Sequence, residues 1–189
     1  MASTTADEPT RRDFIYIATG AVAAVGVGLA AWPFIDQMNP SASVLALASI
    51  EVDIAAIAAG QQVVFKYRGH PLFVRRRTPK EIADARAVNV ADLPDPFARN
   101  KALADDAPAT DANRAPHPEY VVMMGVCTHL GCTPTVSTPA VPQGEYGGWL
   151  CHCHGSQYDT AGRIRKGPAP QNLEVPPYAY LSPTRIKVG

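Results

Sequence analysis

The 189-residue sequence has no net charge, few aromatic residues and only four cysteines. Seventeen Lys and Arg balance seventeen Asp and Glu, which argues against binding of nucleic acid through the overall charge. The low aromatic content of 7%, beside 18 Pro and 14 Gly, is typical of a loop-rich, mainly β fold rather than a helical bundle. Internal repeats and a glycine-rich phosphate loop are also absent from the sequence. Four cysteines are too few for a disulfide scaffold, and all lie within residues 127–153, so we expect the chemistry there.

One long apolar run is present near the N-terminus, because residues 14–35 carry no charged side chain. At the α-helical rise this run spans roughly 33 Å, enough to cross the hydrocarbon core of a bilayer. Trp32 near its far end suits the lipid–water interface. The run therefore predicts a retained transmembrane anchor. A buried core helix and a cleaved signal peptide are the alternatives, although no convincing cleavage site follows the run.

The segments on either side of this run predict its topology. Residues 1–13 contain an Arg-Arg pair, which favours a cytoplasmic N-terminus and resembles a twin-arginine export signal. The remainder of the chain is then expected in the periplasm. Pro40 and the small residues after it predict a flexible linker over residues 36–48, extended or partly helical. The alternative is that this segment already begins the globular head, which we expect over residues 49–189.

The head shows the patterns of short strands. Residues 78–81 read Thr-Pro-Lys-Glu, a capping box that predicts the start of a short helix. Residues 87–118 are rich in Ala, Asp, Asn and Pro without periodicity, which predicts a long irregular surface insertion. Strands are predicted at 50–54, at 63–67 and 72–76 as a hairpin, at 120–124, and at 178–181 and 185–188.

Two segments combine cysteine with histidine, Cys127-Thr128-His129-Leu130-Gly131-Cys132 and Cys151-His152-Cys153-His154-Gly155-Ser156. Sulfur ligands together with imidazole select zinc, copper or an iron–sulfur cluster rather than a hard cation. The spacing differs from the Cys-x2-4-Cys and His-x3-5-His pairs that are common in structural zinc sites. A zinc site, and two ordinary disulfides with bystander histidines, remain as alternatives.

The two segments resemble the paired boxes of a Rieske 2Fe-2S protein. With the anchor, the linker and the later Gly167-Pro168-Ala169-Pro170, nearly the whole chain resembles the iron–sulfur subunit of bacterial quinol–cytochrome c oxidoreductases, the cytochrome bc complex. The resemblance implies a Rieske-type antiparallel β head with a small cluster-binding subdomain at about residues 125–172. Rieske dioxygenases and their soluble ferredoxins generally lack the two extra cysteines that this sequence has.

The resemblance also implies roles for individual residues. One 2Fe-2S cluster would have Cys127 and Cys151 on one iron and His129 and His154 on the other, and the remaining cysteines would form the disulfide Cys132–Cys153. It further implies that the hydroxyls of Ser156 and Tyr158 donate hydrogen bonds to the cluster sulfurs. Leu130, Gly131 and Pro168 would form the tip that docks on a partner and shields the cluster.

Two positions depart from the family pattern. Position 152 is His where the family more often has Pro, and Gln157 stands where it often has His. We expect His152 to be an exposed loop residue and not a ligand. His70 and His117 are expected to be ordinary surface residues.

By this resemblance the protein is a membrane-anchored one-electron carrier of the bacterial inner membrane with a periplasmic head. It would accept an electron and a proton from quinol, with ubiquinol as the donor and His129 and His154 as the contacts, and reduce a c-type cytochrome. The expected partners are a cytochrome b subunit, a c-type cytochrome subunit and membrane lipid, within a dimeric complex that carries the reductase activity. A small Rieske subunit of a periplasmic oxidase such as arsenite oxidase, and a zinc-stabilised interaction module displayed on the membrane, are the alternatives.

Overall fold

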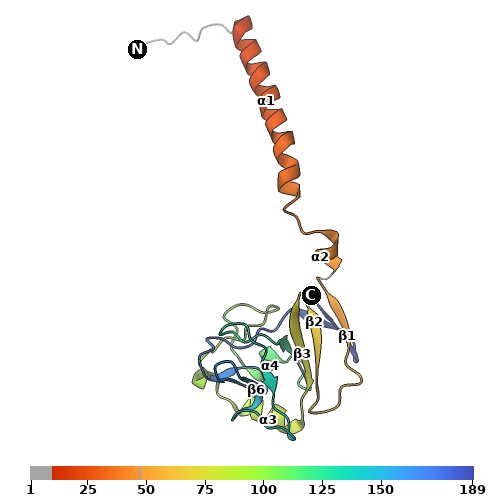
Figure 1. The fold of residues 1–189 in the computed structure, drawn as a ribbon, viewed down its shortest axis with the longest axis vertical. Helices are drawn as coiled ribbons and strands as arrows, with labels where there is room; N and C mark the ends of the chain where they lie inside the picture. The colour runs from red at the N-terminus through yellow and green to blue at the C-terminus, as the bar shows by residue number, and fades with distance from the viewer. Residues whose placement is uncertain (1–9, 47) are drawn as a thin grey trace, which may run out of the picture. The chain divides into compact units, whose positions relative to one another are not determined.

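The computed structural model describes residues 10–46 and 48–189, in two units that divide between Leu45 and Ala46. Residues 1–9 of the predicted export signal, and residue 47 of the predicted linker, lie outside the described residues. The first unit contains the long helix α1 (Arg11–Asp36), and the short helix α2 (Ala42–Ala46) follows after Pro40 (Figure 1). A helical turn therefore forms within the predicted linker.

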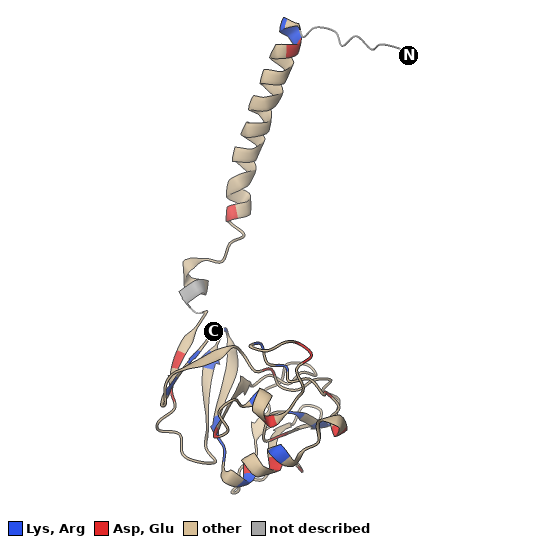
Figure 2. Ribbon diagram, turned by 180° about the vertical axis from the view of Figure 1, so that it is seen from behind, with Lys and Arg blue, Asp and Glu red and all other residues tan. Residues whose placement is uncertain are grey.

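Helix α1 has the length and composition of a membrane span. It begins with a capping box, in which Thr10 and Asp13 satisfy each other's backbone N–H groups. Charged residues occur only at its two ends, and the helix is uncharged between Asp13 and Asp36 (Figure 2). None of its side chains is buried within the described protein. The apolar surface of α1 thus has no protein partner among the described residues, and the helix is long and apolar enough to cross a bilayer.

The second unit is mainly antiparallel β, as the sequence predicts (Figure 1). Two of its sheets have three strands each, in the orders β1-β10-β9 and β2-β3-β4, and the third has four strands in the order β5-β6-β7-β8. The strands are β1 (Ile50–Asp53), β2 (Gln62–Tyr67), β3 (His70–Arg76), β4 (Tyr120–Met124), β5 (Thr135–Val136), β6 (Gly147–Cys151), β7 (Ser156–Asp159), β8 (Ile164–Lys166), β9 (Tyr178–Ser182) and β10 (Arg185–Val188). The helices of this unit are α3 (Pro79–Ala87), the 3₁₀ turn η1 (Val90–Asp92) and α4 (Asp111–Arg114).

Local sequence signals account for the elements that begin the head. Strands β2 and β3 form the predicted hairpin, but its turn is only Arg68-Gly69, because His70 and Pro71 already pair with β2. Both turn residues have positive φ, 48° and 83°, which is the geometry of a type I′ turn that matches the twist of the strands. The predicted capping box of α3 is also confirmed, with Thr78 and Glu81 bonding reciprocally.

The sheet β2-β3-β4 has an apolar core on each of its faces. Val122 in β4 packs with β1 and β10 on one side, whereas Val121 and Met123 pack with Trp149 and Leu173 on the other. A strand that is buried on both faces reads as an unbroken apolar run rather than an alternating one, which explains the sequence YVVMM of β4. Because β4 runs directly into Cys127, this doubly buried strand positions the first cysteine–histidine segment.

The prediction of a surface insertion at residues 87–118 is only half right. The segment is irregular, with one 3₁₀ turn and one short helix. It is not superficial, because Asp95, Ala98, Asp111 and Arg114 are at most 7% exposed. Polar contacts rather than an apolar stripe hold it, and such contacts leave no periodicity in the sequence.

Arg114 is the most heavily bonded of these buried groups. Its guanidinium donates to the carbonyl oxygens of Ala98, Ala161 at 2.6 Å, Gly162 at 3.3 Å and Leu173 at 2.7 Å. Complete burial lowers the pKa of Arg114 to about 10, so it remains a cation at neutral pH. This side chain joins the insertion to the turn before β8 and to Leu173.

Replacing Arg114 tests this contact directly. In Arg114→Met four carbonyls lose the hydrogen bond from the buried guanidinium, so the free energy of unfolding should fall by about 3–5 kcal/mol. Urea unfolding followed by circular dichroism measures this change. The control Lys187→Met removes an exposed cation from β10 and should change stability by less than about 0.5 kcal/mol. Equal losses in the two variants would contradict a structural role for the buried guanidinium.

Candidate metal centre

Two short loops of similar geometry carry the cysteines and histidines. The first cysteine loop, residues 127–132, follows β4, and the second, residues 151–156, joins β6 to β7. In each loop the N–H of a glycine donates to the carbonyl of the cysteine four residues earlier, at 2.9 Å for both Gly131 and Gly155. Both glycines have positive φ, 85° and 78°, a conformation that strains other residues. The Gly in each motif therefore closes the turn that presents the ligand-type side chains.

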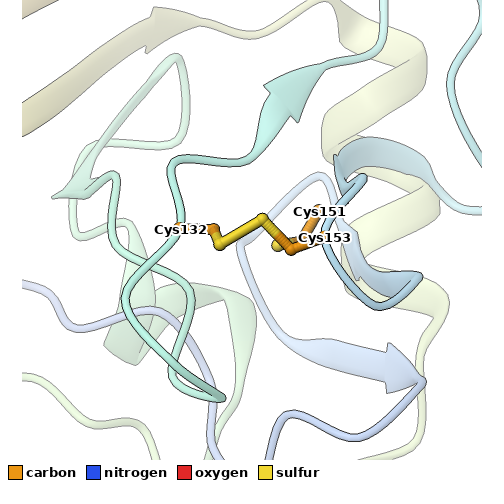
Figure 3. Close-up of side chains that lie close together, drawn as sticks. All are labelled: Cys132, Cys151 and Cys153. Carbon is orange, nitrogen blue, oxygen red and sulfur yellow. A yellow bond between two sulfur atoms is a disulfide. The ribbon is translucent and has the colours of Figure 1, made fainter.

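A disulfide between Cys132 and Cys153 joins the two loops, with the Cα atoms 6.7 Å apart (Figure 3). This confirms the predicted pairing. The sulfur of Cys151 lies close to this bond, because the sulfurs of Cys132, Cys151 and Cys153 are all within 4.8 Å of one another. Since disulfide sulfurs are not thiolate ligands, only Cys151 of this group of three is available to bind a metal.

The two free cysteines, Cys127 and Cys151, are both 2% exposed and their thiols interact. Burial acts to raise the pKa of Cys127, but hydrogen bonds, chiefly from the Tyr158 hydroxyl at 3.3 Å, outweigh it and lower the pKa. Burial, reinforced by the neighbouring Cys127, raises the pKa of Cys151. Two adjacent buried thiols cannot both ionise cheaply unless a cation lies between them.

The two histidines of the cysteine loops lie beside each other. The ring centroids of His129 and His154 are 4.6 Å apart, with the rings perpendicular. Nδ1 of His129 is buried and has no hydrogen-bond partner among the described residues. A buried, unpaired nitrogen costs free energy unless a ligand binds it. The chain thus brings together two thiols and two imidazoles, a donor set that suits a 2Fe-2S cluster with mixed sulfur and nitrogen ligands.

Two hydroxyl groups lie near the thiol of Cys127. Tyr158 is 1% exposed, and burial followed by the nearby Cys127 raises the pKa of its phenol, so it remains a protonated donor. Ser156 is fully buried and lies within hydrogen-bonding reach of Cys127. Both side chains therefore stabilise negative charge on the sulfur of Cys127.

A third loop, residues 167–173, packs against both cysteine loops; we call it the proline loop. Gly167 lies against the second cysteine loop so closely that a Cβ there would be 2.6 Å from Cα of Ser156. The N–H of Ala169 donates to Oγ of Ser156 at 3.1 Å. On the other side, Oγ1 of Thr128 donates to the carbonyl of Gln171 at 2.6 Å. Thr128 stands inside the first motif, yet nothing in the motif indicated that its hydroxyl holds the proline loop.

Other predicted residues are exposed around this centre. Leu130, Gly131 and Pro168 are exposed, and Leu130 retains 72% of its accessible surface. His152 is exposed, as expected for a residue that is not a ligand. The side chain of Gln157, at the position where the family often has His, accepts a hydrogen bond from the N–H of Glu145. The remaining histidines, His70 and His117, are exposed as predicted.

Comparison with known proteins gives consistent matches over the chain. Residues 51–178 match the Rieske [2Fe-2S] domain, and residues 1–41 match a family described as the ubiquitinol-cytochrome C reductase Fe-S subunit TAT signal. The sequence is 54% identical over 188 residues to the ubiquinol-cytochrome c reductase iron-sulfur subunit of Rhodospirillum rubrum, covering 100% of this chain and 96% of that protein. It is 51% identical to the protein of the same name from Bradyrhizobium diazoefficiens, covering 99% and 98%. A chain of a solved hyperthermophilic respiratory complex III is 26% identical, with a TM-score of 0.47 and coverage of 91% and 98%.

Removal of the disulfide should loosen the two cysteine loops measurably. The bond closes a loop with a sequence separation of 21, so Cys153→Ser should lower the free energy of unfolding by about 3 kcal/mol. Urea unfolding with and without a thiol reductant measures this. The reductant should destabilise the wild-type chain and leave the variant unchanged. A wild-type chain that is insensitive to complete reduction would show that the bond contributes nothing.

Proposed function

The chain belongs to the Rieske [2Fe-2S] family, and from this premise we propose that it is the membrane-anchored electron carrier of a bacterial quinol–cytochrome c oxidoreductase. It accepts an electron from ubiquinol, coupled to a proton, and passes the electron to a c-type cytochrome. The observation that carries this proposal is that two disulfide-linked loops carry a pair of buried free thiols that interact and a pair of adjacent imidazoles. The family match excludes the zinc-stabilised module, and relatives matched over the whole length disfavour the small subunit of a periplasmic oxidase.

The ligands in this proposal are Cys127 and Cys151 for one iron and His129 and His154 for the other. Supporting this division, the cysteines are buried whereas His129 is half-buried and His154 is exposed. The histidine side of the centre therefore faces the surface, where a substrate or a partner can reach it. Because the unpaired nitrogen of His129 is Nδ1, this atom is the ligand and Nε2 carries the exchangeable proton.

The protein's own groups adapt this centre to quinol oxidation. Held by these four residues, a 2Fe-2S cluster would supply one-electron chemistry at a potential of roughly −150 to +300 mV, because two of its ligands would be imidazoles rather than thiolates. The hydroxyls of Tyr158 and Ser156 favour the state with more negative charge on sulfur. One imidazole, of His129 or His154, would take the proton that leaves quinol with the electron, at an Nε2 that does not already carry one.

The tip of the centre supplies a docking surface in this proposal. Leu130 follows His129 directly and is 72% exposed, together with Gly131 and Pro168. Burial of an exposed leucine side chain by a partner stabilises the complex by roughly 1.5–3 kcal/mol. Leu130 would thus enter an apolar quinol pocket of a cytochrome b subunit, and would exclude water from His129 there.

The anchor and the linker complete the proposal. Helix α1 spans the bacterial inner membrane with the N-terminus in the cytoplasm and the head in the periplasm, supported by its apolar length and the TAT-signal match. Export after folding suits a head that acquires its cluster in the cytoplasm. Residues 36–48 act as the linker that lets the head reach cytochrome b and the c-type cytochrome in turn. Lipid surrounds the anchor, and the assembly is a dimeric complex.

Substitution of one imidazole tests the ligand set. His129→Cys places a thiolate where the proposal has a neutral ligand, so the high-potential rhombic EPR signal of reduced membranes should disappear. Redox titration followed by EPR measures this. The matched control is His152→Asn, which changes an exposed histidine between the two cysteines of the second loop and should keep the signal. A wild-type spectrum in His129→Cys would remove this residue from the ligand set.

Substitution of the buried phenol tests the tuning of the potential. Tyr158→Phe removes the hydroxyl that donates to Sγ of Cys127, so the midpoint potential should fall while the cluster still assembles. The fall is expected because a donor to sulfur favours the reduced, more negative state. The control Tyr146→Phe removes the hydroxyl of a tyrosine whose ring stacks on Arg165, and it should leave the midpoint potential unchanged. Equal potentials in the two variants would refute the role of Tyr158.

A further inference from the structure

The proline loop has two halves with different surroundings. Its first half contacts the cysteine loops through Ala169 and Gln171. Its second half, Asn172 and Leu173, is at most 1% exposed. Two of its seven residues are prolines and lack an N–H donor, so a ladder of backbone hydrogen bonds cannot fix the loop. Side chains that reach its second half therefore contribute to its position over the cysteine loops.

Asn172 makes the principal contacts of that half. Its Nδ2 donates to the carbonyl oxygens of Asp95 at 3.0 Å and Phe97 at 2.7 Å, both in the insertion. Its Oδ1 accepts from the N–H of Ile164 at 2.8 Å, at the start of β8. Its backbone N–H donates to Oδ2 of Asp95 at 2.9 Å. Asn172 therefore joins the proline loop to both the insertion and β8, with every hydrogen of its amide group used.

Asp95 is itself held in place within the insertion. It is 2% exposed, and Arg99 donates to its two carboxylate oxygens at 2.9 and 3.1 Å. Burial acts to raise the pKa of Asp95, but the bonds from Arg99 and from the N–H groups of Asn172 and Phe97 outweigh it and lower the pKa. An ionised carboxylate is a stronger acceptor for the Asn172 N–H than a neutral group.

Further hydrogen bonds hold the chain after Asn172 against the insertion. Arg114 donates to the carbonyl of Leu173 at 2.7 Å. The N–H of Val175 donates to the carbonyl of Arg99 at 2.9 Å, and the N–H of Lys101 donates to the carbonyl of Val175 at 3.0 Å. Residues 172–175 are thus bound to the insertion by backbone and side chain alike.

We infer that the insertion is a buttress that holds the proline loop against the two cysteine loops, with Asp95 and Asn172 as positioning residues for the redox centre. The inference rests on the proposed function in that the held loop covers a cluster. The connection to the centre is short. Ala169 occupies one lone pair of Oγ of Ser156, which leaves the hydroxyl hydrogen of Ser156 free to point at Cys127. Release of the loop would let Ser156 turn away and admit water.

The test loosens the buttress at Asp95 and follows the loop and the centre separately. Asp95→Ala removes the carboxylate that Asn172 and Arg99 bind, and Asp95→Asn keeps the shape but removes the charge. Both are made in the full-length chain within its membrane complex. Since a charge-assisted hydrogen bond contributes about 1.5–3 kcal/mol, amide exchange in residues 167–173 should accelerate roughly tenfold or more in Asp95→Ala and less in Asp95→Asn. The midpoint potential should fall in the same order.

Two controls separate this role from general destabilisation. Exchange in β1, β9 and β10 should remain at the wild-type rate, and Asp106→Ala, an exposed carboxylate of the same insertion, should change neither readout. Unchanged exchange of residues 167–173 in Asp95→Ala would overturn the buttress. Faster loop exchange with an unchanged potential would overturn the positioning role, as would equal acceleration throughout the head. Absence of a 2Fe-2S EPR signal from the wild-type complex would instead overturn the proposed function. The two failures are distinguishable, because the measurement of amide exchange in the loop does not depend on the cluster signal.

Discussion

The disulfide between Cys132 and Cys153 is the constraint on which the rest of the centre depends. Each cysteine loop is a tight turn closed by one glycine. The free cysteine of each loop, Cys127 or Cys151, is buried, whereas His129 is half-buried and His154 is exposed. Neither loop has enough apolar area of its own to hold the other at a fixed distance. The covalent bond provides this, so that the thiols of Cys127 and Cys151, one from each loop, interact and the imidazoles of His129 and His154 lie beside each other. The proline loop completes the enclosure by binding Thr128 on one side and Ser156 on the other.

The larger architecture supplies a rigid support for these loops. Strand β4 is buried on both faces, so the chain that enters Cys127 has little freedom. The buried cations and carboxylates of the insertion extend this support to the proline loop, where they add polar contacts to the apolar packing of Ala169 and Leu173. In the proposed function, rigid ligands would limit reorganisation when an electron is exchanged, and the exposed Leu130 and His154 would leave the reactive side open. The buried side of the centre thus has the rigid support, and in the proposed function the exposed side is where quinol and the partner subunits bind.

Motifs with local causes could be predicted from the sequence, and contacts between distant segments could not. The β2–β3 hairpin and the capping box at Thr78 follow from short patterns. The Cys132–Cys153 pairing followed only from the family resemblance of the two motifs. Strands β5 to β8 contain two to five residues each and show no clear alternation, so their sheet was not predicted. The insertion was misjudged as superficial because its buried groups, such as Asp95 and Arg114, are of residue types normally found in water. Asn172 gave no signal, because most of its contacts are to partners about 75 residues away.

The central claim is that two imidazoles and two thiolates of this chain hold one cluster. The most direct test is pulsed EPR of the reduced protein with histidine labelled by ¹⁵N. The account predicts two distinct, strongly coupled histidine nitrogens on the reduced centre, because His129 and His154 differ in burial and surroundings. A spectrum with one coupled nitrogen, or with none, would contradict it.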